Sequence, residues 1–317
     1  MASSAVVGDQ RSVWGRLCVK STMEVVGDRA SRLARRDAFV VGVRRSRTAQ
    51  GVAAERAVLA DMGVLADPFA RGMLTPSMAM IFWGIQHVPH VVRARWVTLA
   101  GLAARVLWFD AQVAKALDAG IEQIVVIEAG YDSRAWRFRR DGVQLFELDH
   151  GGTQQDKLRR APGSGPTYVE ADLTNQGAAE ALLEHGLDAS RPALFVVEGV
   201  TMYLSEVVVR HQLGDLASSS AVGSRLAVDF YPPPNAGTSR NHRQLRLQRL
   251  ARVGSGEGFM LAIDRRSAVE LVEHSGWAVK EETSVREAAR ALVPPGSGLA
   301  VDAVNKHKTL VAGLRSW

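Results

Sequence analysis

Residues 123–137, QIVVIEAGYDSRAWR, decide the fold. Their first part, QIVVIE, is a nearly continuous apolar run, which is typical of a strand buried on both faces of a parallel sheet. Gly130 and the polar residues after it predict a tight turn that leads into a helix. Because strands alternating with helices build α/β proteins, this segment predicts the first unit of such a fold.

Six further apolar runs extend the pattern from this segment to the end of the chain. They lie at 143–149, 167–171, 193–197, 225–230, 277–281 and 309–314. Between them, Ser205 predicts the cap of a helix through Leu216, and Ser267 with Glu270 predicts a capping box for a helix that ends at Gly276. The sequence therefore predicts an α/β fold whose sheet is mostly parallel.

The region before the first strand, residues 48–119, is predicted to be helical. Apolar residues recur there every three or four positions and share one helical face: Leu102, Val106, Phe109, Val113 and Leu117. Gly120 follows as a stop signal, and Arg105 lies beside the apolar face.

Charge is distributed unevenly along the 317 residues, whose formal net charge is +6. Residues 1–47 hold ten Lys or Arg against four acids, and the remaining chain carries 29 of each sign. No aromatic interleaving or nucleic-acid motif accompanies the basic segment, so we expect a partly disordered leader and no nucleic-acid partner. Residues 232–258, with three prolines and a basic stretch, predict a lid or surface excursion in the main domain, 48–317.

Several protein classes are excluded by composition. With 47% hydrophobic and 23% charged residues, the chain is typical of globular proteins. The longest nearly apolar stretch, 96–109, contains Arg105 and is too short to span a membrane. The first ten residues lack the pattern of a secretory signal, so a cytoplasmic location is expected. Cys18 is the single cysteine, and the HxxH spacing of His87 and His90 lacks further ligands, so no metal site is predicted.

A nucleoside site is predicted at the carboxyl ends of the strands, where open parallel sheets bind ligands. Asp149 ends the second strand, 19 residues after Gly130, where a carboxylate accepts hydrogen bonds from a ribose diol. The turn at Gly130 lacks the second and third glycines that a pyrophosphate requires. This favours S-adenosyl-L-methionine, a cationic cofactor without phosphate, over a dinucleotide.

Two further strand ends carry acids. Asp172 and Leu173 follow the third strand, where a carboxylate and a backbone N–H suit the edge of adenine. Asp172 is equally suited to cap the next helix, and both interpretations stay open. Glu198 follows the fourth strand and is expected to point toward the same cleft.

These motifs together resemble the leucine carboxyl methyltransferase-like family, including its actinobacterial branch of S-adenosyl-L-methionine-dependent methyltransferases. The matching stretches, from about Thr48 onward, are GVAAERA (51–57), DPFA (67–70), Arg105 with Phe109 and Asp110, AGYDSRAWR (129–137), FELD (146–149), ADL (171–173) and VEGVTMYL (197–204). Their order and spacing also agree, which makes the resemblance more specific than any single motif.

The resemblance implies a class I methyltransferase fold, with a Rossmann-like sheet of seven strands, an antiparallel last strand and a helical N-terminal cap. It also implies a role for each cofactor-binding residue. Arg105 pairs with the methionine carboxylate, Gly130 lies under the methionine moiety, Asp149 holds the ribose, Asp172 and Leu173 read adenine, and Glu198 faces the amino end. An arginine fork is the natural partner of a carboxylate.

The sequence departs from the family at two positions. Glu128 stands where the glycine-rich turn usually begins GAG, and Leu107 stands where relatives commonly carry a second Arg. The expected function is methylation of a carboxylate or hydroxyl oxygen on a small, hydrophobic acceptor, with no catalytic base assigned among Tyr203, His150 and Glu198. A non-catalytic nucleoside-binding homologue and, less favoured, an NAD-dependent oxidoreductase remain alternatives.

Overall fold

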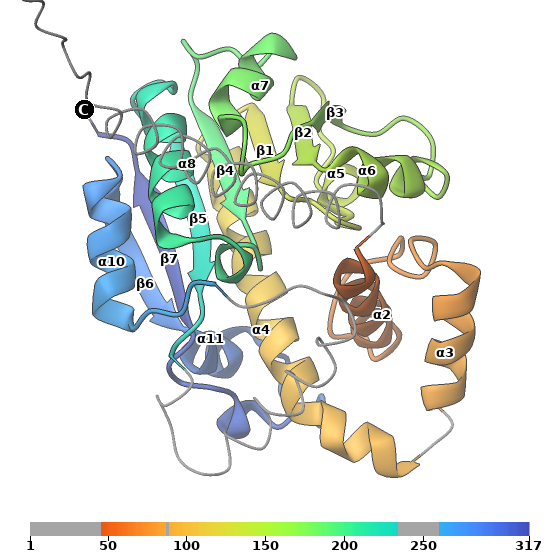
Figure 1. Cartoon of the computed structure of the whole chain (residues 1–317). Helices are drawn as coiled ribbons and strands as arrows, with labels where there is room; N and C mark the ends of the chain where they lie inside the picture. The colour runs from red at the N-terminus through yellow and green to blue at the C-terminus, as the bar shows by residue number, and fades with distance from the viewer. Residues whose placement is uncertain (1–45, 87–88, 234–259, 317) are drawn as a thin grey trace, which may run out of the picture. The chain divides into compact units, whose positions relative to one another are not determined.

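The computed structural model describes residues 46–86, 89–233 and 260–316 (Figure 1). Within these residues seven strands form one sheet in the order β3-β2-β1-β4-β5-β7-β6. The strands are β1 (Gln123–Ile127), β2 (Gln144–Asp149), β3 (Thr167–Glu170), β4 (Ala193–Val197), β5 (Arg225–Phe230), β6 (Ala278–Ser284) and β7 (Thr309–Leu314). Only β7 runs antiparallel to its neighbours, β5 and β6. The predicted α/β fold and all seven predicted strands are confirmed.

The sheet is buried on both faces, as the continuous apolar runs predict. Ile124 and Val126 pack with α4 (Pro89–Asp118) and α11 (Val285–Leu292) on one face. Val125 and Ile127 pack on the other face with α7 (Ala178–Glu184), α8 (Glu206–Ser218) and α10 (Arg265–His274). Because successive strand residues point to opposite faces, one run of β1 supplies both cores.

The predicted helical region forms three helices: α2 (Arg47–Asp61), α3 (Pro76–Gln86) and α4. The apolar face that begins at Leu102 is buried on α4, which confirms the helical periodicity. A small core of α2 alanines, Met73 and Tyr131 joins this region to the turn after β1. The predicted helical region is interrupted between α2 and α3. The interrupting segment carries the DPFA motif, and its Asp67 belongs to the site described below.

Capping confirms one predicted helix start and corrects another. The Ser205 hydroxyl accepts the N–H of Val208 at 3.3 Å and begins α8 as expected. The predicted cap at Ser267 is wrong, because the Asp264 carboxylate accepts the N–H of Ser267 at 2.9 Å and starts α10 three residues earlier. The capping box lies instead at Ser284, at the start of α11. Two short helices, α5 (Arg134–Arg137) and α6 (Gly151–Leu158), follow β1 and β2.

Other predictions fall on residues that the structure does not describe. The leader, 1–47, and the insertion, 232–258, lie almost entirely outside the described residues, as does His87. Together with the domain boundaries they stay predictions. In the described part of the chain, no helix has the length and apolar character required to cross a membrane.

The link from α10 to β6 provides a test of the core. Trp277 is 0% exposed, and its indole N–H donates to the Leu213 carbonyl of α8 at 2.9 Å. We expect Trp277→Phe to lower the free energy of unfolding by about 2–3 kcal/mol, because it opens a cavity and removes the buried indole hydrogen bond. Urea denaturation measures the loss. Trp83→Phe is the matched control, since Trp83 is 65% exposed, and an equal loss there would contradict the argument.

Candidate active site

Four of the predicted site residues meet at the carboxyl edge of the parallel strands. Gly130 follows β1, Asp149 ends β2, Glu198 follows β4, and Arg105 reaches them from α4. The Gly130 N–H donates to Asp149 Oδ2 at 2.5 Å, and the His150 N–H donates to Oδ1 at 2.6 Å. Burial raises the pKa of Asp149, and these two backbone donors oppose the rise. The turn after β1 thus holds the carboxylate of Asp149, the residue predicted to bind ribose.

Arg105 and Glu198 form a buried ion pair. Arg105 Nε donates to Glu198 Oε1 at 2.9 Å, and Arg105 Nη1 contacts the Tyr231 hydroxyl at 3.1 Å. The second oxygen of Glu198 lies 2.7 Å from Arg134 Nη1. Gly199 allows this approach, because a Cβ at that position would lie 3.3 Å from Arg105 Nη1. The sequence predicted both charged residues but not that they bind one another.

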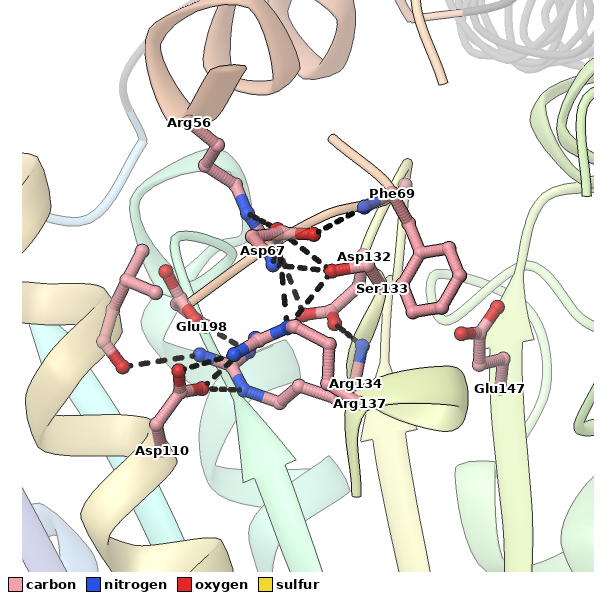
Figure 2. A network of polar contacts seen from close by, with 12 residues as sticks. Arg56, Asp67, Phe69, Asp110, Asp132, Ser133, Arg134, Arg137, Glu147 and Glu198 are labelled. Carbon is pink, nitrogen blue, oxygen red and sulfur yellow. Dashed lines mark hydrogen bonds and ion pairs between the residues drawn. The ribbon is translucent and has the colours of Figure 1, made fainter. Parts of the chain in front are cut away.

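The Arg105–Glu198 pair belongs to a larger ion network (Figure 2). Arg134 Nη1 lies 2.6 Å from Asp132 Oδ2, and its Nε lies 2.7 Å from Asp110 Oδ1. Among the described residues this network joins five cations and five anions, each with a side chain at most 15% exposed. They are Arg56, Arg105, Arg134, Arg137 and Lys308, with Asp67, Asp110, Asp132, Glu198 and Asp229. The network is therefore charge-balanced as well as buried.

Guanidinium groups lower the pKa of two acids of this network, Asp132 and Glu198. Burial alone would raise the pKa of Asp132, yet Arg134 and Arg56 hold that pKa well below its usual value. Burial also opposes ionisation of Glu198, and Arg134 and Arg105 lower its pKa in the same way. Glu198 is accordingly a bound anion, which disfavours it as the base left open by the sequence.

The structure treats the two residues predicted to bind adenine, Asp172 and Leu173, differently. Asp172 Oδ1 accepts the N–H of Thr174 at 2.9 Å, and its Oδ2 accepts the Asn175 amide at 2.7 Å. These contacts close a local turn, and the alternative that Asp172 caps the next helix is wrong, because α7 begins at Ala178 with Gly177 as its N-cap. Leu173 is buried and lines an apolar cavity of about 20 Å³, together with Ile127 and Val197 at the ends of β1 and β4. Leu173 therefore lies with the site, whereas the carboxylate of Asp172 is engaged locally.

Comparison with known proteins identifies the family. The sequence model of the family described as leucine carboxyl methyltransferase matches residues 48–217. The chain belongs to the leucine carboxyl methyltransferase family. The resemblance drawn from the motifs is confirmed.

The relatives agree with this assignment. A protein of Mycolicibacterium paratuberculosis is 30% identical, over 81% of this chain and 87% of its own length. A protein of Mycobacterium marinum is 29% identical, over 73% of this chain and 82% of its own length. Both are named "putative S-adenosyl-L-methionine-dependent methyltransferase". The predicted enzyme class and cofactor, methyltransferase and S-adenosyl-L-methionine, are confirmed by the family and these relatives.

A solved structure supports the fold. The crystal structure of a "putative methyltransferase" from Thermobifida fusca matches with a TM-score of 0.54 at 16% identity. The match covers 78% of this chain and 93% of that one. At this identity the likeness concerns the fold alone.

Within the family framework, the departure at Glu128 has a structural counterpart. Glu128 has a φ of +50° and is the one non-glycine residue with positive φ in the described part of the chain. A left-handed conformation costs a side-chain-bearing residue about 1–2 kcal/mol. The turn therefore keeps a glycine-like backbone even though the residue is glutamate.

Sequence reasoning missed several members of the ion network. Asp229 and Lys308 were not considered, although Asp229 interrupts the apolar run RLAVDF of β5. A charge near the carboxyl end of an otherwise apolar strand was the available signal, since buried charges require partners. Asp132 and Arg134 entered only as letters of a matching motif. His150, weighed as a base, instead caps α6 by accepting the Gly152 N–H on Nδ1 at 3.3 Å.

The Glu128 backbone gives a stability prediction. We expect Glu128→Gly to raise the free energy of unfolding by about 0.5–1 kcal/mol, because glycine relieves the left-handed strain at a smaller entropic cost. Ala129→Gly is the matched control and should lower it by about 1 kcal/mol, since Ala129 has no such strain to relieve. Chemical denaturation measures both. A loss of stability in Glu128→Gly would mean that side-chain contacts of Glu128 outweigh the strain.

A second buried pair lies on β2 and α6, and Figure 2 labels its acid, Glu147, with no dashed line to the ion network. Lys157 Nζ lies 2.5 Å from Glu147 Oε2, and both side chains are buried. Burial raises the pKa of Glu147 to about 7, although Lys157 opposes the rise. The folded state therefore binds more protons than the unfolded state between about pH 4.5 and pH 7.

This pair predicts a pH dependence of stability. The contribution of Glu147 to the free energy of unfolding should fall by about 3 kcal/mol as the pH rises through that window, and it should be constant above it. We expect the double variant Glu147→Gln/Lys157→Met to show a smaller difference between pH 5 and pH 7.5 than the wild type in urea denaturation. The same difference in both proteins would refute the assignment.

Proposed function

We propose that this chain is an S-adenosyl-L-methionine-dependent O-methyltransferase that acts on a carboxylate or hydroxyl oxygen of a small, hydrophobic molecule. The observation that carries the proposal is the buried Arg105–Glu198 pair beside the Gly130 turn. We also propose a cytoplasmic location for the protein.

The donor set fits the amino-acid end of the cofactor. An α-amino acid is a zwitterion, whose carboxylate suits a guanidinium and whose ammonium suits a carboxylate. Arg105 and Glu198 offer these two partners 2.9 Å apart. Because the surrounding network is charge-balanced, a zwitterion joins it without leaving a buried charge uncompensated. We therefore assign the methionine carboxylate to Arg105 and the amino group to Glu198.

The nucleoside end is assigned to the neighbouring strand ends. Each oxygen of Asp149 accepts one backbone N–H, and a carboxylate has about four acceptor sites, so acceptor capacity remains for a ribose diol. Gly130 would lie under the methionine moiety, and Leu173 would contact adenine through its backbone N–H. We retain Asp172 as a weaker assignment, because Thr174 and Asn175 already engage its carboxylate.

The reaction demands positioning more than acid–base chemistry. When bound, the cofactor supplies an electrophilic methyl group on a sulfonium. The chain has to hold the acceptor oxygen in line with that methyl group and exclude water. A carboxylate acceptor is already a nucleophile, whereas a hydroxyl requires a base.

Calorimetric titration with S-adenosylhomocysteine and with adenosine tests the assignment. We expect one-to-one binding of both ligands and no stoichiometric complex with NAD. Arg105→Met should weaken S-adenosylhomocysteine by roughly 10–100-fold and adenosine little, because only the former carries the carboxylate. Asp149→Ala should weaken both. Retained adenosine binding shows that the Arg105 variant is folded.

The strained turn motivates a second candidate, a non-catalytic nucleoside-binding homologue. In that case Glu128 obstructs the methionine moiety. An increase of tenfold or more in the affinity of Glu128→Gly for S-adenosylhomocysteine would favour this candidate. Unchanged or weaker binding would favour the enzyme, and no binding of either ligand to the folded wild type would refute the methyltransferase site.

A further inference from the structure

We propose that Tyr231 is the catalytic base of this enzyme and that the acceptor presents a hydroxyl group, an alcohol or a phenol. This inference rests on the proposed function and deepens it, since the sequence leaves carboxylate and hydroxyl acceptors open. Three observations carry it: where Tyr231 lies on the sheet, which charges surround its phenol, and which other bases are already engaged.

Tyr231 lies at the edge of the sheet that holds the other site residues. It follows β5 directly, and β5 pairs with β4, the strand that leads into Glu198. Its hydroxyl lies 3.1 Å from Nη1 of Arg105, the residue assigned to the methionine carboxylate. The phenol therefore lies beside the proposed cofactor end, where an acceptor oxygen must also be held.

Two cations favour the ionised phenol. Arg105 contacts the hydroxyl, and Lys308 Nζ lies 3.8 Å from the centre of the Tyr231 ring. Asp229 is the nearby anion, and it is engaged by the Gly199 N–H at 2.6 Å and by Lys308 at 2.9 Å. Burial alone would raise the pKa of Tyr231, but Lys308 and Arg105 lower it below its ordinary value.

A cavity of about 370 Å³ lies close in sequence to the same residues. It is lined by Pro232, Asp264, Arg265, Arg266, Lys306 and His307. Pro232 follows Tyr231 and His307 precedes Lys308, and neither Tyr231 nor Lys308 lines the cavity itself. Its volume is that of small-molecule sites.

Two of the three bases left open by the sequence are engaged elsewhere. Glu198 is held as an anion by Arg105 and Arg134, and His150 caps α6. The third, Tyr203, lies in the 3-10 helix Thr201–Tyr203 that follows β4. The phenol of Tyr231 contacts two cations of the site, Arg105 and Lys308.

The proton and electron balance follows from this placement. The acceptor oxygen bonds to the methyl carbon while its proton passes to Tyr231 Oη. The carbon–sulfur bond breaks, and its electron pair stays on sulfur. The neutral phenol then returns the proton to solvent. A carboxylate acceptor would make this transfer unnecessary, which is why the base implies a hydroxyl.

Titration of the phenols by near-ultraviolet absorbance tests the proposal without any acceptor. The chain has four tyrosines, and burial raises the pKa of two others, Tyr131 and Tyr168. We expect the first phenolate to form below the ordinary tyrosine pKa, to vanish in Tyr231→Phe and to move to higher pH in Lys308→Met. Tyr168→Phe is the matched control and should keep it. A first step that persists in Tyr231→Phe would overturn the proposal.

A pair of probes then tests the acceptor class, 1-naphthol and 1-naphthoic acid with labelled S-adenosyl-L-methionine. We expect methylation of the naphthol, with kcat lowered by 10²-fold or more in Tyr231→Phe and S-adenosylhomocysteine affinity kept within about threefold. Methylation of the acid at a rate that Tyr231→Phe does not change would overturn the proposal and leave the methyltransferase function intact. If the folded wild type does not bind S-adenosylhomocysteine, the proposed function itself is refuted.

Discussion

Buried charges that must remain paired are the constraint on which the carboxyl edge of this sheet depends. Removing one partner from a buried ion pair costs about 3–5 kcal/mol, because the other charge is left uncompensated. Here the ten charged side chains come from α2, the segment after it, α4, the turn after β1, α5, the ends of β4 and β5, and the residue before β7. Each of these segments is therefore positioned by the others.

This constraint gives the matching motifs a physical meaning. DPFA supplies Asp67 to Arg56, and the SRAWR stretch supplies Arg134 to Asp110 and Glu198. Arg134 and Glu198 are 64 residues apart in the sequence, yet they meet within ion-pair distance. A network of this kind orients Arg105 and Glu198 before any ligand arrives, which reduces the entropy lost on binding.

The fold could be predicted from the sequence because its signals are local. Continuous apolar runs identify strands buried on both faces, and the acids at their ends identify the ligand edge. Pairing between distant side chains leaves no such signal. The sequence contains Arg105 and Glu198, but only the register of β4 against β1 and the path of α4 bring them together. The wrong prediction at Ser267 has a similar origin. Asp264 and Ser267 are three residues apart and both are of the type that caps a helix, and it is Asp264 that accepts the capping hydrogen bond.

The turn after β1 combines a left-handed backbone with an acidic edge. The Gly130 N–H donates to Asp149 from this turn, and the backbone at Glu128, two residues earlier, is left-handed. The carboxylate of Asp149 is held by two backbone N–H donors and stands outside the charge-balanced ion network. An acid at this edge suits the net positive charge of a sulfonium cofactor and repels the pyrophosphate of a dinucleotide, which agrees with S-adenosyl-L-methionine as the cofactor rather than NAD.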